Sequence, residues 1–139
     1  IYITAGIPLQ SADQADSKVI IINNTLSSDD GKNAIWDNSR SSGYPIVISA
    51  NNLFVGSSMP HLGRTPSYEG NNLTGTAASF VNLAGDDLHL APGASAIDAA
   101  DPVWAPSDDR DQRMRPLDGK GSGKAIADVG AFEYVPSGR

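Results

Sequence analysis

Short runs of β-branched residues that end in paired asparagines dominate the first half of the chain. Three segments share this pattern, Val19–Leu26, Ile46–Phe54 and Glu69–Leu73, and the first two enter the asparagine pair from an apolar run. Successive pairs are separated by steps of 28 and 20 residues. A repeat of this length with strand-forming residues predicts a solenoid, whose repeats stack as parallel strands about 4.8 Å apart.

The asparagine pairs have a structural explanation. Asparagine tolerates the left-handed backbone of a sharp corner between two sheets, and its amide can bond to the asparagines above and below in a ladder. We therefore assign Asn24, Asn52 and Asn72 a structural role at the corners. Sugar binding by these amides is the functional alternative.

The remaining sequence lacks the periodicity of helices. Residues 27–45 and 56–71 are expected to form loops that project from the repeats and can carry function. Residues 100–125 are polar and are expected to be irregular. Short strands or turns are expected at 34–36 and 77–81, and short strands at 88–90, 96–98 and 129–134.

Composition narrows the range of functions. The formal net charge of −6 argues against nucleic acid and anionic membrane surfaces as partners, because both attract basic patches. The absence of cysteine excludes disulfides, thiolate catalysis and zinc–thiolate sites. No apolar run reaches the length of a membrane-spanning helix. Because the chain opens directly on the strand-like Ile1–Thr4, we expect it to be a fragment whose upstream part is missing.

The C-terminal third carries three blocks of turn-forming and charged residues. They read Asp86-Asp-Leu-His-Leu-Ala-Pro-Gly-Ala-Ser-Ala-Ile-Asp-Ala-Ala100, Asp109-Arg-Asp-Gln-Arg-Met-Arg-Pro116 and Asp128-Val-Gly-Ala-Phe-Glu-Tyr134. Together they resemble the C-terminal end of secreted bacterial right-handed parallel β-helix proteins, the pectate-lyase-like superfamily. Ala100 and Gln112 stand where that pattern usually has glycine.

The resemblance implies a fold, a boundary and a location. The fold would be all-β, a right-handed parallel β-helix of about three to four coils with an irregular C-terminal cap. The coils would occupy residues 1–85, and the terminal coil and cap residues 86–139. The protein would be secreted or displayed on a bacterial cell surface. The open N-terminal end would stack on another copy or on upstream coils, because unpaired strand edges attract other strands.

The resemblance also implies a polysaccharide as partner, and a polysaccharide lyase that acts on an acidic glycan. Such an enzyme needs a base near the C5 proton and a cation that neutralises the adjacent carboxylate. Candidates for these roles are Lys18, Arg40, Tyr44, His61, Arg64 and Tyr68. Because the site of such proteins usually lies on central coils, we expect no turnover from this fragment alone.

Three other functions stay open. Glycoside hydrolysis would need two carboxylates about 5–10 Å apart, and Asp29, Asp30 and Asp37 lie on candidate loops. A non-catalytic carbohydrate-binding or cell-surface module would use a face of the coils as a groove. A stability cap would bind no ligand.

Calcium is the one cofactor that the sequence indicates. Asp108, Asp109 and Asp111 form an oxygen-rich cluster of the kind that binds Ca²⁺. The preferred interpretation is structural, with these carboxylates paired to three neighbouring arginines, Arg110, Arg113 and Arg115.

The other charged residues of the tail are interpreted as structural. Arg115 is expected to bridge to Asp128 or Glu133, since a buried arginine needs a carboxylate partner. Asp98 joins this structural set. His89 alternates with two leucines, so its side chain is expected to face away from the core.

Overall fold

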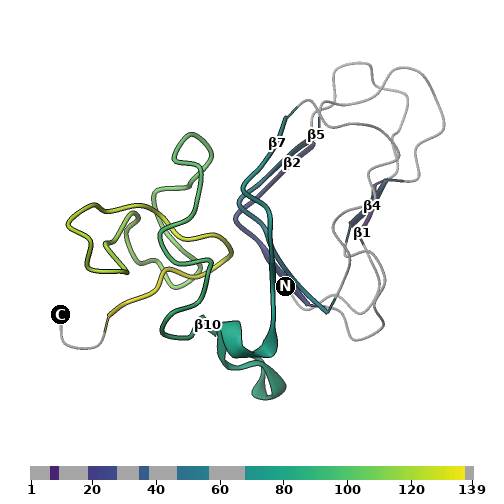
Figure 1. Ribbon diagram of the computed structural model, residues 1–139. Helices are drawn as coiled ribbons and strands as arrows, with labels where there is room; N and C mark the ends of the chain where they lie inside the picture. Colours follow the sequence, from purple (N-terminus) through teal and green to yellow (C-terminus); the bar gives the residue numbers. More distant parts are fainter. Residues whose placement is uncertain (1–6, 10–18, 28–34, 38–46, 57–67, 137–139) are drawn as a thin grey trace.

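The computed structural model describes residues 7–9, 19–27, 35–37, 47–56 and 68–136 (Figure 1). Ten short strands lie within them: β1 (Ile7–Leu9), β2 (Val19–Ile22), β3 (Thr25–Ser27), β4 (Ile35–Asp37), β5 (Val47–Ala50), β6 (Leu53–Val55), β7 (Tyr68–Gly70), β8 (Leu73–Gly75), β9 (Phe80–Asn82) and β10 (Asp87–Leu90). Two 3₁₀ turns, η1 (Ala77–Ser79) and η2 (Leu83–Gly85), flank β9.

The strands of the first half stack in parallel sets. β2, β5 and β7 form one three-stranded sheet, β3, β6 and β8 form a second, and β1 pairs with β4. Ile20, Ile48 and Tyr68 are register partners in one row across the first sheet. Figure 1 shows the two three-stranded sheets diverging at an angle. The green and yellow C-terminal segment, or tail, which comprises residues 91–136, lies on the outer side of that angle.

The prediction of a right-handed parallel β-helix of three to four coils is wrong. The described strands form three short parallel sets and, from β9 and β10, an antiparallel pair. The chain turns back after β9 because the side chain of Asn82 accepts a hydrogen bond from Gly85 N and Asp86 adopts a left-handed conformation with φ 61°. The all-β class predicted from the sequence is confirmed.

Both regions that were expected to be loops contain strands. β4 lies within residues 27–45, where it pairs with β1, and β7 lies within residues 56–71, where it pairs with β5. β4 coincides with the short strand or turn expected at 34–36, whereas β7 adds a parallel neighbour to a sheet in a stretch whose polar residues suggested a loop.

Two of the strands expected in the tail are absent. The strand expected at 88–90 is β10, but residues 96–98 and 129–134 form turns and irregular backbone. Their backbone groups bond to separate segments instead of a sheet neighbour, as Val129 N does to Ala96 O at 2.9 Å.

The two asparagines of each pair have different roles. The first member has a left-handed backbone in every pair, with φ of 49° at Asn23, 56° at Asn51 and 51° at Asn71. The second member forms the ladder, in which Asn24 Nδ2 donates to Asn52 Oδ1 at 3.1 Å and Asn52 Nδ2 donates to Asn72 Oδ1 at 2.9 Å. The sequence predicted both properties for the pair, and the structure divides them between its members.

The first asparagine of each pair also holds the C-terminal segment against the sheets. Its Nδ2 donates to a backbone carbonyl of that segment, from Asn23 to Asp128 at 2.9 Å, from Asn51 to Asp101 at 3.0 Å and from Asn71 to Ala99 at 3.1 Å. The C-terminal segment therefore runs along the row of corners.

The main hydrophobic core lies between the second sheet and the C-terminal segment. Leu53 and Val55 of β6 are buried against apolar side chains from β10 and the tail, including Leu88, Leu90, Ile97, Val129 and Phe132. Packing of these side chains, together with the corner asparagines, positions the loops of the tail that are described next.

Candidate functional sites

Tyr68 is the one lyase candidate that lies among the described residues. The other five, Lys18, Arg40, Tyr44, His61 and Arg64, lie outside them. Asp29 and Asp30 also lie outside, and Asp37 ends β4. The lyase and hydrolase functions therefore stay predictions.

Tyr68 contacts Asp101 and Trp104 of the C-terminal segment. Its hydroxyl donates to Asp101 Oδ2, and its ring centroid lies 5.4 Å from that of Trp104 with an angle of 39° between the planes. Asp101 is held in turn by the carboxamide of Asn51, which bonds to both its backbone N–H (2.7 Å) and its carbonyl (3.0 Å). Tyr68 and Trp104 are half-buried, so part of each side chain faces solvent.

The hydrogen bond between Tyr68 and Asp101 shifts the pKa values of both groups. The bond raises the pKa of the Tyr68 hydroxyl, which stays a protonated donor at neutral pH. The same bond, with the backbone N–H of Val103 at 2.9 Å, lowers the pKa of the Asp101 carboxyl. The site therefore presents a carboxylate of fixed orientation beside two aromatic rings.

Apolar side chains continue from Tyr68 across the first sheet. Ile48 and Ile20 are its successive register partners, and Ile20 is 52% exposed. Strands lie about 4.8 Å apart, so Ile20, Ile48, Tyr68 and Trp104 form a continuous row, here named the aromatic strip. It is the first candidate ligand surface.

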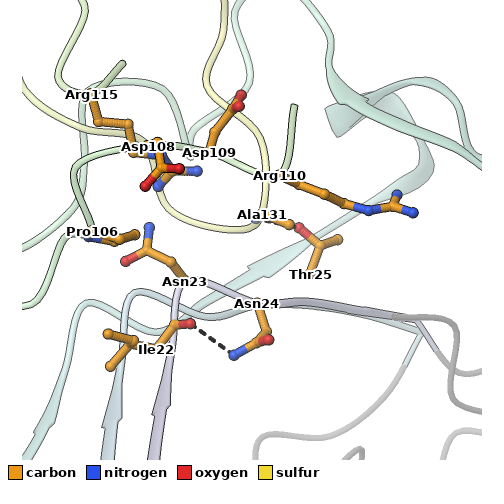
Figure 2. Close-up of a pocket in the computed structure, with 10 residues that line it drawn as sticks. All are labelled: Ile22, Asn23, Asn24, Thr25, Pro106, Asp108, Asp109, Arg110, Arg115 and Ala131. Atoms are coloured by element: carbon orange, nitrogen blue, oxygen red, sulfur yellow. Dashed lines mark hydrogen bonds between the residues drawn. The ribbon is translucent and has the colours of Figure 1, made fainter. Parts of the chain in front are cut away.

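A cleft of about 380 Å³ opens between the first corner and the C-terminal segment (Figure 2). Residues 22–25, where β2 turns into β3, form one side. The other side comes from the C-terminal segment, with Pro106, Asp108, Asp109, Arg110, Arg115 and Ala131. In Figure 2 the Arg110 side chain extends away from Asp108, whereas Asn23 points toward it.

Asp109 lines this cleft but is occupied by internal hydrogen bonds. Its Oδ1 accepts from the backbone N–H groups of Asp111 (2.8 Å) and Arg113 (2.9 Å), and its Oδ2 accepts from that of Glu133 (2.9 Å). A buried carboxylate with this many amide donors organises the loop around it.

The carboxylates of Asp108 and Asp111 have other partners. Asp108 is exposed and accepts a hydrogen bond from Ser107 Oγ at 3.3 Å, and Asp111 lies 3.5 Å from Arg113 Nη1. Within the described ranges, no group of three or more His, Asp or Glu side chains is arranged to hold a metal ion. Calcium binding by Asp108, Asp109 and Asp111 stays a prediction.

Arg115 is buried, donates two hydrogen bonds and forms an ion pair with Glu133. Nη1 and Nη2 donate to the backbone carbonyls of Asp128 and Gly130 at 3.0 Å each, and Nε lies 3.4 Å from Glu133 Oε2. The structure thus places the guanidinium beside the carboxylate of Glu133 and on the backbone, rather than the carboxylate, of Asp128. Burial lowers the pKa of Arg115.

The carboxylates of Asp128 and Glu133 are buried and bonded to backbone N–H groups. Asp128 accepts from Asp98 (2.7 Å) and Tyr134 (2.5 Å), and Glu133 accepts from Leu117 (2.7 Å) and Asp128 (3.0 Å). Burial raises the pKa of Asp128 to about 7 and raises that of Glu133. Because both groups are enclosed, they brace the tail and do not reach a ligand.

Asp98 has the same kind of role nearer the surface. Its Oδ1 accepts from Gly119 N at 2.9 Å and its Oδ2 from Lys120 N at 2.7 Å. The carboxylate therefore holds the 118–124 loop, whose glycines and lysines would otherwise suggest an anion site.

His89 lies between two carboxylates, an arrangement that sequence reasoning missed. Its Nδ1 is 2.6 Å from Asp87 Oδ1 and its Nε2 is 2.8 Å from Asp111 Oδ2, while the ring packs on Phe132 with centroids 4.3 Å apart. These bonds raise the pKa of His89 and lower those of Asp87 and Asp111. The alternation in β10 could have indicated the Asp87 contact, since residues two apart share one face of a strand.

The comparisons with known proteins returned no relationship. No protein-family model matches the chain, and neither a curated protein nor a solved structure matches it. In the part of the chain that the structure describes, no helix has the length and apolar character needed to cross a membrane.

Proposed function

We propose that this chain is a non-catalytic carbohydrate-binding module whose ligand surface is the aromatic strip. The observation that supports it is the half-exposed Tyr68–Trp104 pair beside the fixed carboxylate of Asp101. Ligand sites combine apolar and aromatic surface with a few placed polar groups. Sugar rings suit such a surface, because their C–H faces pack on aromatic rings and their hydroxyls donate to a carboxylate at the ring edge.

The ligand is expected to be a neutral glycan. Asp101 is a charged group beside the strip, and its carboxylate would repel the carboxylates of an acidic glycan. The net charge of −6 acts in the same direction at longer range. This proposal therefore departs from the acidic glycan that the resemblance implies.

Affinity electrophoresis of the full chain tests this proposal. Gels that contain xylan or a β-glucan should retard the protein, whereas pectate and alginate should retard it less. Trp104→Ala should weaken binding about tenfold or more, because aromatic anchors carry most of the binding energy. Val103→Ala is the matched control, since Val103 is adjacent and 76% exposed but lies outside the strip.

Three outcomes would contradict the proposal. The first is that no glycan retards the protein, and the second is that Trp104→Ala leaves the retardation unchanged. The third is ultraviolet absorbance from unsaturated uronates when the chain is incubated with pectate or alginate, which would show lyase turnover.

A further inference from the structure

Asp101 is a carboxylate of fixed orientation that has no cationic partner in the described part of the chain. Its oxygens accept hydrogen bonds from the Tyr68 hydroxyl and from the backbone N–H of Val103, which are both uncharged donors. None of the ion pairs that the described residues form includes it. A carboxylate has about four lone-pair sites, so Asp101 can accept further donors from a ligand.

Other carboxylates of the C-terminal half have the cation that Asp101 lacks. Asp111 Oδ2 lies 2.8 Å from His89 Nε2. Glu133 Oε2 lies 3.4 Å from Arg115 Nε. Asp101 is half-buried as well, and a partly desolvated negative charge attracts a positive charge more strongly than one in bulk water does. Its surroundings therefore favour a cation that comes from a ligand.

Two aromatic rings lie beside this carboxylate. The Tyr68 hydroxyl donates to Asp101, and the Trp104 ring centroid lies 5.4 Å from that of Tyr68 with a tilt of 39°. Both aromatic side chains are half-buried. The face of an aromatic ring attracts a cation through its quadrupole, and tryptophan does so most strongly. The carboxylate and the rings therefore favour the same sign of charge in a ligand.

The position of the Tyr68 hydroxyl depends on Gly70, the next residue on the same face of β7. A Cβ at Gly70 would lie 2.6 Å from the hydroxyl oxygen of Tyr68 and 2.9 Å from its Cζ, so the Tyr68 ring occupies the space beside the glycine. The Gly70 carbonyl accepts from Asn51 N at 3.1 Å, and the Asn51 side chain holds the backbone of Asp101. The strand and the corner therefore position the tyrosine and the carboxylate before a ligand binds.

We infer that the aromatic strip prefers glycans that carry protonated amino groups, such as a β-linked glycan of glucosamine units. The ammonium group of the amino sugar pairs with Asp101, and the sugar ring that carries it packs on Trp104. This inference rests on the proposed function and refines its expectation of a neutral glycan.

The charge of the whole chain acts in the same direction. A net charge of −6 attracts a cationic glycan at long range. Hydrogen bonds to a charged donor are stronger than those between neutral groups, so an ammonium group gains more from Asp101 than a sugar hydroxyl does. Glycans with amino groups should therefore bind more tightly than neutral glycans, and neutral glycans more tightly than acidic ones.

Isothermal titration calorimetry of the full chain tests the inference at about pH 6, where primary amines are protonated. The probes are β-1,4-linked hexamers of glucose, N-acetylglucosamine and glucosamine. They share a backbone and differ in the substituent at C2, which is a hydroxyl, a neutral acetamido group or an ammonium group. The glucosamine hexamer should bind about fivefold or more tightly than either neutral hexamer. Added salt should reduce this difference, because it screens a partly exposed ion pair.

Two carboxamide variants test whether Asp101 causes the preference. Asp101→Asn keeps the shape of the side chain and removes its charge, while Asn51 still holds the backbone. The preference for the glucosamine hexamer should then fall to about twofold or less. Asp86→Asn is the matched control, because it removes the same charge at an exposed residue outside the strip, where asparagine tolerates the left-handed backbone. This variant should keep the full preference.

The possible results separate this inference from the proposed function. Equal affinity for the three hexamers, with Trp104→Ala still weakening each of them, would overturn the amine preference and leave the proposed function standing. A preference that survives in Asp101→Asn, or that Asp86→Asn removes as well, would overturn the role of Asp101. Binding of none of the hexamers would overturn the inference, and electrophoresis with xylan and β-glucan would then decide the proposed function.

Discussion

Asn23 Nδ2 donates a 2.9 Å hydrogen bond to the backbone carbonyl of Asp128, which is 105 residues further along the chain. The same amide lies 3.3 Å from Gly130 O, and Asn23 Oδ1 accepts from Asn51 Nδ2 at 3.1 Å. One corner residue therefore turns the chain between two sheets and also anchors the tail.

Substitutions at Asn23 should separate these two contributions. Asn23→Gly keeps the left-handed backbone but loses the buried hydrogen bonds, and should cost about 2–3 kcal/mol of the free energy of unfolding. Asn23→Ala should cost about 1 kcal/mol more, because alanine strains at φ 49°. Urea unfolding measures both, with Asn71→Gly as the control, since its exposed side chain makes one bond to the tail. Equal losses at Asn23 and Asn71 would contradict the anchoring role.

Gly130 should tolerate no side chain. It has φ 100°, and a Cβ there would lie 2.7 Å from Thr25 Oγ1 and 3.2 Å from Leu53 Cβ. Gly130→Ala should therefore cost about 3–5 kcal/mol, from backbone strain and displacement of the tail. Gly123→Ala is the matched control, because Gly123 has φ 85° but nothing within 4 Å of a Cβ, so strain alone costs about 1–2 kcal/mol. Thermal unfolding that gave the same loss for both variants would exclude the close approach.

Arg115→Lys should destabilise the tail although it keeps the positive charge. An ammonium group cannot reach the carbonyls of Asp128 and Gly130 and the Glu133 carboxylate together, as the planar guanidinium does. We expect a loss of about 3 kcal/mol. Arg113→Lys, at an exposed position, should change stability by less than about 0.5 kcal/mol. A chemical unfolding series that ranked the two variants equally would show that the geometry of Arg115 is unimportant.

Stability should fall as the pH rises from 3.8 to about 7, where Asp128 titrates, and further above 6.5, where His89 titrates. The pKa of His89 is raised above 6.5 in the folded chain, so its contribution is complete below that pH and is lost as the pH rises through the folded value. Asp128 acts in the same direction. Its pKa of about 7 exceeds the unfolded value of 3.8, so the folded chain holds a proton that the unfolded chain releases.

Two variants show which residues cause this pH dependence of stability. His89→Gln should remove the part that titrates above pH 6.5, and Asp128→Asn should flatten the slope between 3.8 and about 7. The measurement is the urea midpoint, followed by tryptophan fluorescence at several pH values. A midpoint that rose with pH over this range in the unmodified chain would contradict both assignments.

Local chemistry made part of this fold predictable from the sequence. The asparagine pairs mark the corners because a left-handed turn and an amide ladder depend on residues close in sequence or at matching repeat positions. The β-helix and the last strand at 129–134 were wrong, because the chain turns back after β9 and the tail bonds to corner side chains rather than to a neighbouring strand.

The candidate site was less predictable. Tyr68 was named for its chemistry, but Asp101 and Trp104 carry no local pattern that connects them to it. Asp101 reaches Tyr68 because the Asn51 carboxamide holds its backbone. Asp111 likewise reaches His89 through a loop that Asp109 organises.

By itself, the sequence determined the strand-forming runs, the corner asparagines and the carboxylate–arginine character of the tail, since these follow from side-chain shape, backbone preference and charge. Only the tertiary structure decided which groups meet, such as Asn23 with Asp128 and Tyr68 with Asp101. These contacts depend on how the C-terminal segment lies along the row of corners, and that placement results from burial of Leu53, Val129 and Phe132 in one core.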